Sequence, residues 1–240
     1  MNGSHLLIAD EAPARPGGNR REQLLEVLAF LFLIVPSMVL SFFALKQGTA
    51  GFDLVALATM LRDAALVCLI AYFLWRRGEP MTRVGWTGKS ASREVAIGVA
   101  LFIPLLIATS FIEEALRAAG FSGPSSTPKF LTPSGGLEFA AASVLVIVVA
   151  FAEETIFRGY LILRFEALTG SATAAAFLSA IIFAVGHGYE GTAGVATVGL
   201  MGLALAAVYL WRRSLVAPIV MHFLQDFIGI VLLPLMAHHH

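Results

Sequence analysis

Seven long apolar runs constrain this chain more than any other feature of its sequence. Most of them approach the roughly 20 residues that a helix needs to cross a bilayer. The apolar residues do not alternate with a period of two, so membrane strands are not expected. The sequence predicts an all-α, polytopic membrane bundle of seven to eight transmembrane helices, the eighth being a short or re-entrant segment. The runs are Val27–Leu45, Leu54–Trp75, Val95–Ile112, Phe139–Ala152 continuing to Leu168, Ala172–Val185, Ala193–Trp211 and Leu215–Met236.

The composition excludes several other classes of protein. Of the 240 residues, 58% are apolar and 13% are charged, whereas about 25% of the residues in a soluble domain are charged. The mean hydropathy is +0.82, which excludes a soluble or disordered chain. The 16 Lys and Arg residues are balanced by 16 Asp and Glu residues, so no basic excess indicates nucleic-acid binding. The single cysteine, Cys68, excludes a disulfide framework and a cysteine-based zinc site.

The chain divides into a tail, two groups of spans and a connecting loop. Residues 1–23 are rich in Pro, Gly, Arg and Glu, and we expect a mobile tail without a signal-cleavage site. Residues 24–117 hold three spans and form an accessory part. Residues 118–136 are rich in Pro and Gly and form a loop. Residues 137–236 hold four spans, and residues 237–240 are interpreted as the remnant of a purification tag.

The Lys and Arg residues outside the spans predict the orientation in the membrane. With the N-terminus inside, eleven cations fall on the inner side and three on the outer side. Because inner loops carry the excess of positive charge, we expect a multi-pass protein of a prokaryotic cytoplasmic membrane with a cytoplasmic N-terminus. The inner cations are Arg15, Arg20, Arg21, Arg76, Arg77, Arg83, Lys89, Arg93, Arg164, Arg212 and Arg213, and the outer ones are Lys46, Arg117 and Lys129.

Two adjacent carboxylates in the fourth span are the most informative polar residues, because ionisable groups inside a membrane are costly and mark functional sites. Glu154 and Arg158 are four residues apart, so they can pair along one helical face. Glu153 is turned by about 100° from its neighbour and can point into a separate cavity. We expect Glu153 to be the carboxylate that takes a proton, with the Glu154–Arg158 pair as its support. A purely structural ion pair is the alternative for Glu154 and Arg158.

The fifth span places an imidazole at the height of Glu153. If the fourth and fifth spans turn at Gly170, Glu153 precedes the turn by 17 residues and His187 follows it by 17. At about 1.5 Å per residue both side chains lie about 25 Å from the turn. A carboxylate and an imidazole side by side can act as general bases toward a bound water. Phe183, one helical turn before His187, is expected to wall this site.

The seventh span adds His222 and Asp226, whose spacing places them on one helical face. A histidine donor beside Asp226 can face an oxyanion. The same spacing also suits metal ligands, although the H-E-x-x-H arrangement of zinc proteases is absent. Both interpretations remain open from the residues alone.

Three motifs in the C-terminal half resemble those of one protein family. Glu153-Glu154-Thr-Ile-Phe-Arg158 resembles EExxxR, Phe183-Ala-Val-Gly-His187 resembles FxxxH, and His222-Phe-Leu-Gln-Asp226 resembles HxxxN/D. Their order and spacing are those of the CPBP family of CAAX proteases and bacteriocin-processing enzymes, which includes the Ras-converting CAAX endopeptidase. The resemblance covers roughly residues 139–236, and the first three spans match only in being hydrophobic.

The resemblance implies an intramembrane glutamic endopeptidase without a cofactor. By position, Glu153 and His187 would activate the water, and His222 with Asp226 would stabilise the oxyanion. Glu154 and Arg158 would hold the constellation together. The CAAX endopeptidases typically carry Asn where this chain has Asp226, and an ionised carboxylate repels an oxyanion. Asp226 is therefore either protonated or orients His222. The expected substrate is a membrane-associated or prenylated protein or peptide, and prenyl specificity is not implied.

Two other functions compete with this hypothesis. A zinc-dependent membrane protease would use the same residues and would bind metal. A non-catalytic immunity or assembly protein would use none of them chemically. A transporter would show two related halves, and no such repeat is seen. Two further charged clusters are interpreted as structural: Arg62–Asp63 as a pair in the second span, and Glu113–Arg117 as a solvated helix end.

Overall fold

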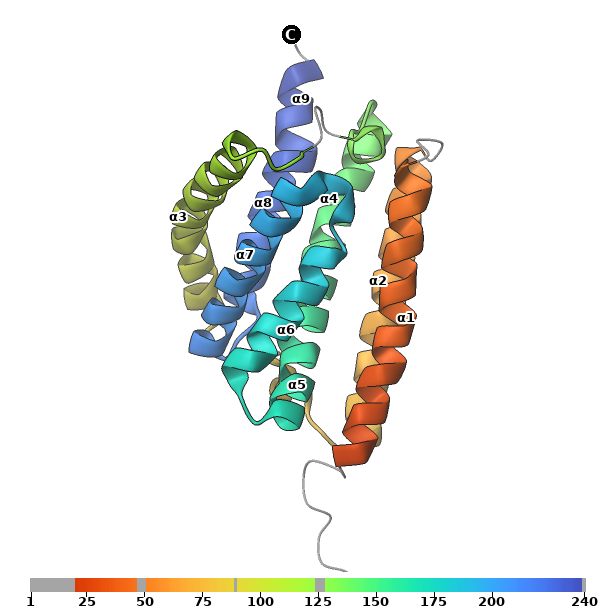
Figure 1. The fold of residues 1–240 in the computed structure, drawn as a ribbon, viewed down its shortest axis with the longest axis vertical. Helices are drawn as coiled ribbons and strands as arrows, with labels where there is room; N and C mark the ends of the chain where they lie inside the picture. The colour runs from red at the N-terminus through yellow and green to blue at the C-terminus, as the bar shows by residue number, and fades with distance from the viewer. Residues whose placement is uncertain (1–19, 47–50, 89, 124–127, 239–240) are drawn as a thin grey trace, which may run out of the picture.

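The computed structural model describes the chain except for residues 1–19, 47–50, 89, 124–127 and 239–240. The described part is helical and contains no strand, and its helices form one bundle (Figure 1). The α-helices are α1 (Arg20–Lys46), α2 (Phe52–Arg76), α3 (Ala91–Ala118), α4 (Gly136–Glu153), α5 (Ile162–Thr169), α6 (Ala172–Val185), α7 (Gly191–Arg212), α8 (Val216–Asp226) and α9 (Leu233–His238). Two π-helical segments, η3 (Glu154–Leu161) and η5 (Phe227–Leu232), join α4 to α5 and α8 to α9.

Three short 3-10 turns lie in the connections between these helices. They are η1 (Met81–Val84), η2 (Lys129–Leu131) and η4 (Gly188–Glu190). The turn η1 lies between α2 and α3, η2 precedes α4, and η4 separates α6 from α7. The two latter turns lie at the end of the bundle opposite the start of α1 (Figure 1).

The predicted spans coincide with the helices of the structure. Five helical stretches of the described chain are long and apolar enough to cross a membrane: Phe52–Arg76, Ala91–Ala118, Gly136–Thr169, Gly188–Arg212 and Val216–Ala237. The apolar helix α6 is shorter. The all-α, polytopic bundle expected from the sequence is therefore confirmed, and the chain is a multi-pass membrane protein.

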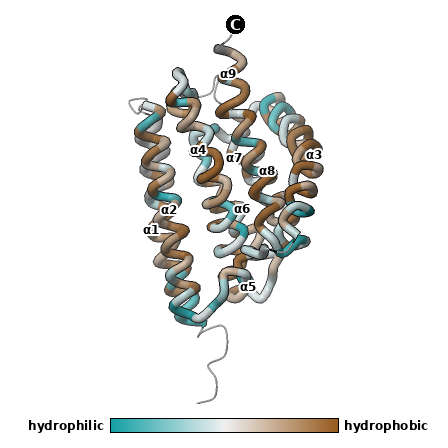
Figure 2. Tube along the Cα trace, turned by 180° about the vertical axis from the view of Figure 1, so that it is seen from behind, coloured by the Kyte–Doolittle hydropathy of each residue, from teal (hydrophilic) through white to brown (hydrophobic). Residues whose placement is uncertain are grey.

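The outer surface of the bundle is apolar, as lipid contact requires. Phe32, Phe111 and Leu137 are 76%, 70% and 89% exposed. Hydrophobic residues run along the outer helices, while hydrophilic residues gather near the start of α1 (Figure 2). In lipid such side chains need no burial against protein, since the surrounding acyl chains are equally apolar.

The first helix begins at Arg20, earlier than the boundary of the expected tail at residue 23. Gln23 is buried, and the Arg20 guanidinium donates a hydrogen bond to the Leu168 carbonyl at 2.6 Å. The Arg77 side chain donates to the Glu26 carboxylate at 2.7 Å. These contacts with α5 and the end of α2 explain the earlier start. The remainder of the expected tail, and the last two tag residues, lie outside the described residues.

The helix that carries the two adjacent glutamates widens into a π-helix directly after Glu153. All eight residues of η3 are buried. Gly159 lies where η1 approaches closest, because a Cβ atom there would be 2.7 Å from the Val84 carbonyl oxygen. π-Helical turns are rare and often mark functional sites. The wider turn thus coincides with the motif that the sequence singled out.

A tight turn at Gly170 reverses the chain between α5 and α6, where the sequence placed it. Gly170 has a φ of 74°, a conformation that glycine adopts without strain. The Ser171 hydroxyl then accepts a hydrogen bond from the Ala174 amide at 3.2 Å and caps α6. This hairpin brings the η3 motif and the end of α6 together.

Candidate active site

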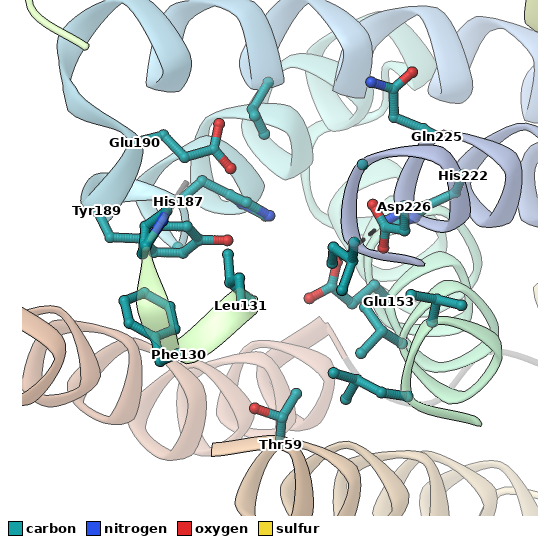
Figure 3. A pocket seen from close by; sticks show the side chains of 18 of the residues that line it. Thr59, Phe130, Leu131, Glu153, His187, Tyr189, Glu190, His222, Gln225 and Asp226 are labelled. Carbon is teal, nitrogen blue, oxygen red and sulfur yellow. Dashed lines mark ion pairs between the residues drawn. The ribbon is translucent and has the colours of Figure 1, made fainter. Parts of the chain in front are cut away.

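A cavity of about 910 Å³ opens between the helices beside the π-helical motif. Side chains from α2, α4, α7 and α8 and from the turns η2 and η4 line it (Figure 3). Its polar wall includes both span histidines and several carboxylates. Glu153, His187, Glu190, His222 and Asp226 are among the lining residues.

Glu154, Arg158 and His222 form a buried hydrogen-bonded network behind this wall. One oxygen of Glu154, Oε1, accepts from Arg158 Nη1 and from His222 Nδ1, both at 2.8 Å. The Glu154 and Arg158 side chains are 0% and 2% exposed. Arg158 also donates to the Gly202 carbonyl at 3.4 Å, which ties the network to α7. A carboxylate with two close donors in a dry interior is a charge-assisted arrangement that fixes both partners.

Glu153 lies in the cavity wall, beside the His222 ring of this network. Its side chain is 12% exposed. Its Oε2 atom is buried and has no hydrogen-bond partner among the residues that the structure describes. The nearest imidazole nitrogen, His222 Nε2, is 3.8 Å from that atom. Helical rotation has therefore separated the two glutamates: Glu154 holds Arg158 and His222 through its Oε1 atom, and Glu153 lines the cavity.

His187 lies across the cavity from Glu153, on a turn rather than on a helix. The helix α6 ends at Val185, two residues earlier. The His187 Nδ1 atom is 2.9 Å from the Phe183 carbonyl oxygen, and a carbonyl can only accept. Figure 3 shows the His187 ring and the Glu153 carboxylate on opposing walls. Both side chains line the cavity, as expected from their equal distance from the turn at Gly170. No hydrogen bond or ion pair joins these two described side chains.

His222 and Asp226 share one face of α8, as their spacing predicted. The His222 Nε2 atom is 3.4 Å from Asp226 Oδ2. The imidazole is buried, and the Asp226 side chain is 22% exposed. Since Nδ1 is held by Glu154, Nε2 is the ring nitrogen that faces the cavity and the carboxylates of Glu153 and Asp226.

Phe183 is a fully buried wall between the two histidines. Its ring lies 4.7 Å from the His187 ring and 6.0 Å from the His222 ring. The Arg158 guanidinium carbon lies 4.3 Å from the Phe183 ring centre, which is cation–π geometry. The aromatic ring therefore packs against both imidazoles and covers the buried cation.

The turns η2 and η4 together form a second wall of the cavity, and the sequence did not predict that they meet. Tyr189 and Glu190 on η4 line it, and Tyr189 packs edge-on against Phe130 of η2 at 5.6 Å. The Ser122 carbonyl accepts from the Ala193 amide at 2.8 Å and holds the start of α7 in place. No local sequence signal links η2 with η4, because they are about 60 residues apart in the chain.

The two remaining charged clusters also reach the cavity, since Arg62, Glu113 and Arg117 are among its lining residues. Arg62 lines the cavity and pairs with the buried Asp63 at 2.8 Å. Arg117 and Glu113 form an i, i+4 ion pair at 2.6 Å, and both side chains are well exposed, at 42% and 38%. In the part of the chain that the structure describes, no group of three or more His, Cys, Asp or Glu side chains is arranged to hold a metal ion.

Comparison with known proteins identifies this part of the chain. Residues 135–228 match the family described as type II CAAX prenyl endopeptidase Rce1-like. This part of the chain is therefore similar to that family. All three sequence motifs fall within the matched residues, and helices α1 to α3 precede them. No curated protein and no solved structure matches the chain. The family's description is that of an endopeptidase, so the match supports a protease, which is a hydrolase, in this part of the chain.

Proposed function

We propose that the protein is an intramembrane endopeptidase that uses Glu153 and His187 to activate a water molecule. Its substrate would be a membrane-associated or lipidated protein or peptide. The observation that carries this proposal is the Glu153 carboxylate, whose side chain is 12% exposed in a cavity whose opposite wall holds His187. A carboxylate that lines a cavity can accept a hydrogen bond from a bound water and take its proton.

The tautomer of His187 supports its part in this proposal. In the neutral ring, Nδ1 carries the proton, since it donates to the Phe183 carbonyl. The other nitrogen, Nε2, then holds a lone pair and can accept a proton from water. A general base must lie within one water of the proton that it takes. A water between Glu153 and His187 would satisfy this requirement from both walls.

His222 is the proposed donor to the oxyanion that forms when the water attacks. Its Nδ1 atom is anchored on Glu154, which points Nε2 toward the cavity. A donor fixed before the reaction stabilises the developing charge without reorganisation. Arg158 keeps Glu154 in place and is thus a positioning residue.

Asp226 is proposed to orient His222 rather than to bind the oxyanion itself. Its Oδ2 atom is 3.4 Å from Nε2, the cavity-facing nitrogen of His222. A carboxylate there stabilises the protonated imidazole, and that charge in turn stabilises the oxyanion. This role differs from that of an asparagine amide, which could donate directly.

The zinc-dependent alternative is less well supported. The lining carboxylates and imidazoles are distributed over two walls, and the described residues form no metal-binding group of three. We therefore propose catalysis without a metal cofactor.

The charge distribution also supports a proposed orientation. Most arginines of the described chain lie at the end of the bundle where α1 starts, whereas the η2 and η4 walls lie at the other end (Figure 1). By the positive-inside rule, we propose that the N-terminus is cytoplasmic and the cavity lies toward the opposite leaflet. The arginines are Arg20, Arg21, Arg76, Arg77, Arg83, Arg93, Arg164, Arg212 and Arg213.

The proposed activity can be tested without knowing the natural substrate. The purified protein in liposomes is incubated with a library of membrane-inserted peptides, and new termini are identified by mass spectrometry. The proposal expects cleavage by the wild type and none by Glu153→Gln. Equal product patterns from both proteins would refute it.

A further inference from the structure

A second hollow lies at the end of the bundle where α1 starts, away from the proposed active site. It has a volume of about 380 Å³ and is lined by Arg83, Leu163, Glu166, Ala167 and Arg213. Three elements meet there: the turn η1, the helix α5 and the turn between α7 and α8. The three polar side chains comprise two cations and one anion.

Arg83 and Arg213 lie in two connections of the chain that are hydrogen-bonded to each other. The Leu215 amide donates a hydrogen bond to the Gly85 carbonyl at 3.1 Å. Gly85 has a φ of 89°, and a Cβ atom there would lie 2.7 Å from the Tyr209 ring. Only glycine allows this approach of η1 to the end of α7. Arg83 and Arg213 are thus held at the two sides of one hollow.

Arg213 is held in a conformation that arginine rarely adopts. It ends α7 with a φ of 52°, in the left-handed region where glycine is the usual residue. A side chain kept at a strained position points to a function for that side chain. Glycine would adopt this backbone conformation without strain, but it would not supply the positive charge of the arginine side chain.

Among the residues that the structure describes, no carboxylate forms an ion pair with either arginine. Other arginines at this end are paired: Arg212 with Glu94 at 2.6 Å, and Arg164 with Glu79 at 2.9 Å. Arg83, Arg213 and Glu166, in contrast, form no ion pair with each other or with another described residue within 4.0 Å. All three charges therefore remain available to a ligand that brings both signs.

The hollow lies at the depth of the lipid headgroups. The spans α2 and α7 end at Arg76 and Arg212, and Trp75 and Trp211 precede those residues. The two indoles are 76% and 64% exposed. Exposed tryptophans at the ends of spans mark the interface between acyl chains and water. A ligand in this hollow therefore meets the headgroup layer of the adjoining leaflet.

We propose that this hollow binds the headgroup of a phospholipid that carries a primary ammonium, with phosphatidylethanolamine as the chemical type. Arginine binds phosphate oxygens through paired charge-assisted hydrogen bonds, which assigns the phosphate to Arg83 and Arg213. Glu166 accepts from the ammonium. The quaternary ammonium of phosphatidylcholine has no N–H to donate, and the headgroup of phosphatidylglycerol has no cation for Glu166. The site thus selects by hydrogen bonding as well as by charge.

Lipid binding is measured by native mass spectrometry of the purified full-length protein with chain-matched phosphatidylethanolamine, phosphatidylcholine and phosphatidylglycerol. The wild type is expected to bind phosphatidylethanolamine about tenfold tighter than phosphatidylcholine, as one additional charge-assisted hydrogen bond provides. Glu166→Gln is expected to lose this preference, and Arg83→Gln to lose affinity for both lipids. Arg76→Gln, which removes an exposed charge at the same end but outside the hollow, is the matched control and is expected to change neither.

Arg213→Gly separates binding from folding. It is expected to weaken lipid binding like Arg83→Gln while leaving the melting temperature unchanged or higher, because glycine suits the left-handed conformation. Equal binding of the three lipids by the wild type, an unchanged preference in Glu166→Gln, or an equal loss in Arg76→Gln would overturn the proposal. Displacement of the lipid by equimolar inorganic phosphate would also overturn it, since the site would then hold a soluble phosphate.

Discussion

The Nδ1 atom of His222 lies 2.8 Å from Oε1 of Glu154, a carboxylate oxygen that also accepts from Arg158. This contact joins the EExxxR motif in α4 and η3 to the HxxxD motif in α8. It fixes which ring nitrogen of His222 faces the cavity. The two adjacent glutamates consequently have different surroundings, and this difference underlies the predictions below.

Replacing Asp226 by Asn tests whether residue 226 orients His222 or donates to the oxyanion. We expect Asp226→Asn to lower kcat about tenfold, because the charge-assisted contact with His222 Nε2 is lost. Cleavage rates at saturating substrate provide the measurement. An unchanged or higher kcat would indicate instead that residue 226 donates directly, as an asparagine amide can.

Removing the buried carboxylate of Glu154 is expected to destabilise the fold. Glu154→Ala leaves the Arg158 cation without its partner in the interior, which costs about 3–5 kcal/mol. The measurement is the free energy of unfolding in detergent. The control is Glu113→Ala, which breaks an i, i+4 pair of the same type at an exposed position and is expected to cost at most about 1 kcal/mol. Similar losses in both variants would contradict the buried network.

We predict that position 202 must be glycine because Phe183 and Arg158 pack closely against it. A Cβ atom there would lie 3.2 Å from a Phe183 ring carbon and 3.3 Å from Arg158 Nη2. Gly202→Ala is expected to destabilise the protein by about 1–3 kcal/mol, seen as a lower melting temperature. At Gly199 the Cβ would meet only Ala184 at 3.4 Å. Gly199→Ala should therefore be neutral or stabilising by up to about 1 kcal/mol. The opposite order would be inconsistent with this packing.

Chelation distinguishes the two protease mechanisms. If Glu153 and His187 activate the water without a metal, dialysis against a strong zinc chelator leaves the rate of cleavage unchanged. The readout is the rate before and after chelation, with metal content measured on the same sample. Loss of activity that returns on addition of zinc would favour the zinc-dependent alternative.

The sequence predicts the helices well because apolar length is the dominant signal in a membrane chain. Every predicted run lies, to within one residue, inside a continuous helical stretch of the structure, and the α5–α6 turn at Gly170 follows from the glycine itself. Helix ends were less predictable, since they depend on distant partners. The start of α1 at Arg20 rests on contacts such as that between Glu26 and Arg77, which are 51 residues apart.

The candidate site was predictable on one wall only. Helical spacing relates Glu154 to Arg158 and His222 to Asp226, and both pairs are in contact. His187 departs from the expected arrangement because α6 ends at Val185, so a helical extrapolation does not hold for the last two residues. The wall made by Phe130 and Tyr189 can be predicted only from the tertiary fold. No periodicity in the sequence connects the two turns that carry these residues.

Glu153→Gln tests the central claim most directly, because it removes the proposed base while keeping the shape of the side chain. The measurement is kcat of the variant in liposomes, together with its melting temperature. We predict a loss of about 100- to 10,000-fold in kcat, the usual contribution of a general base, with the melting temperature unchanged. A variant that folds like the wild type and still cleaves at the wild-type rate would contradict the account.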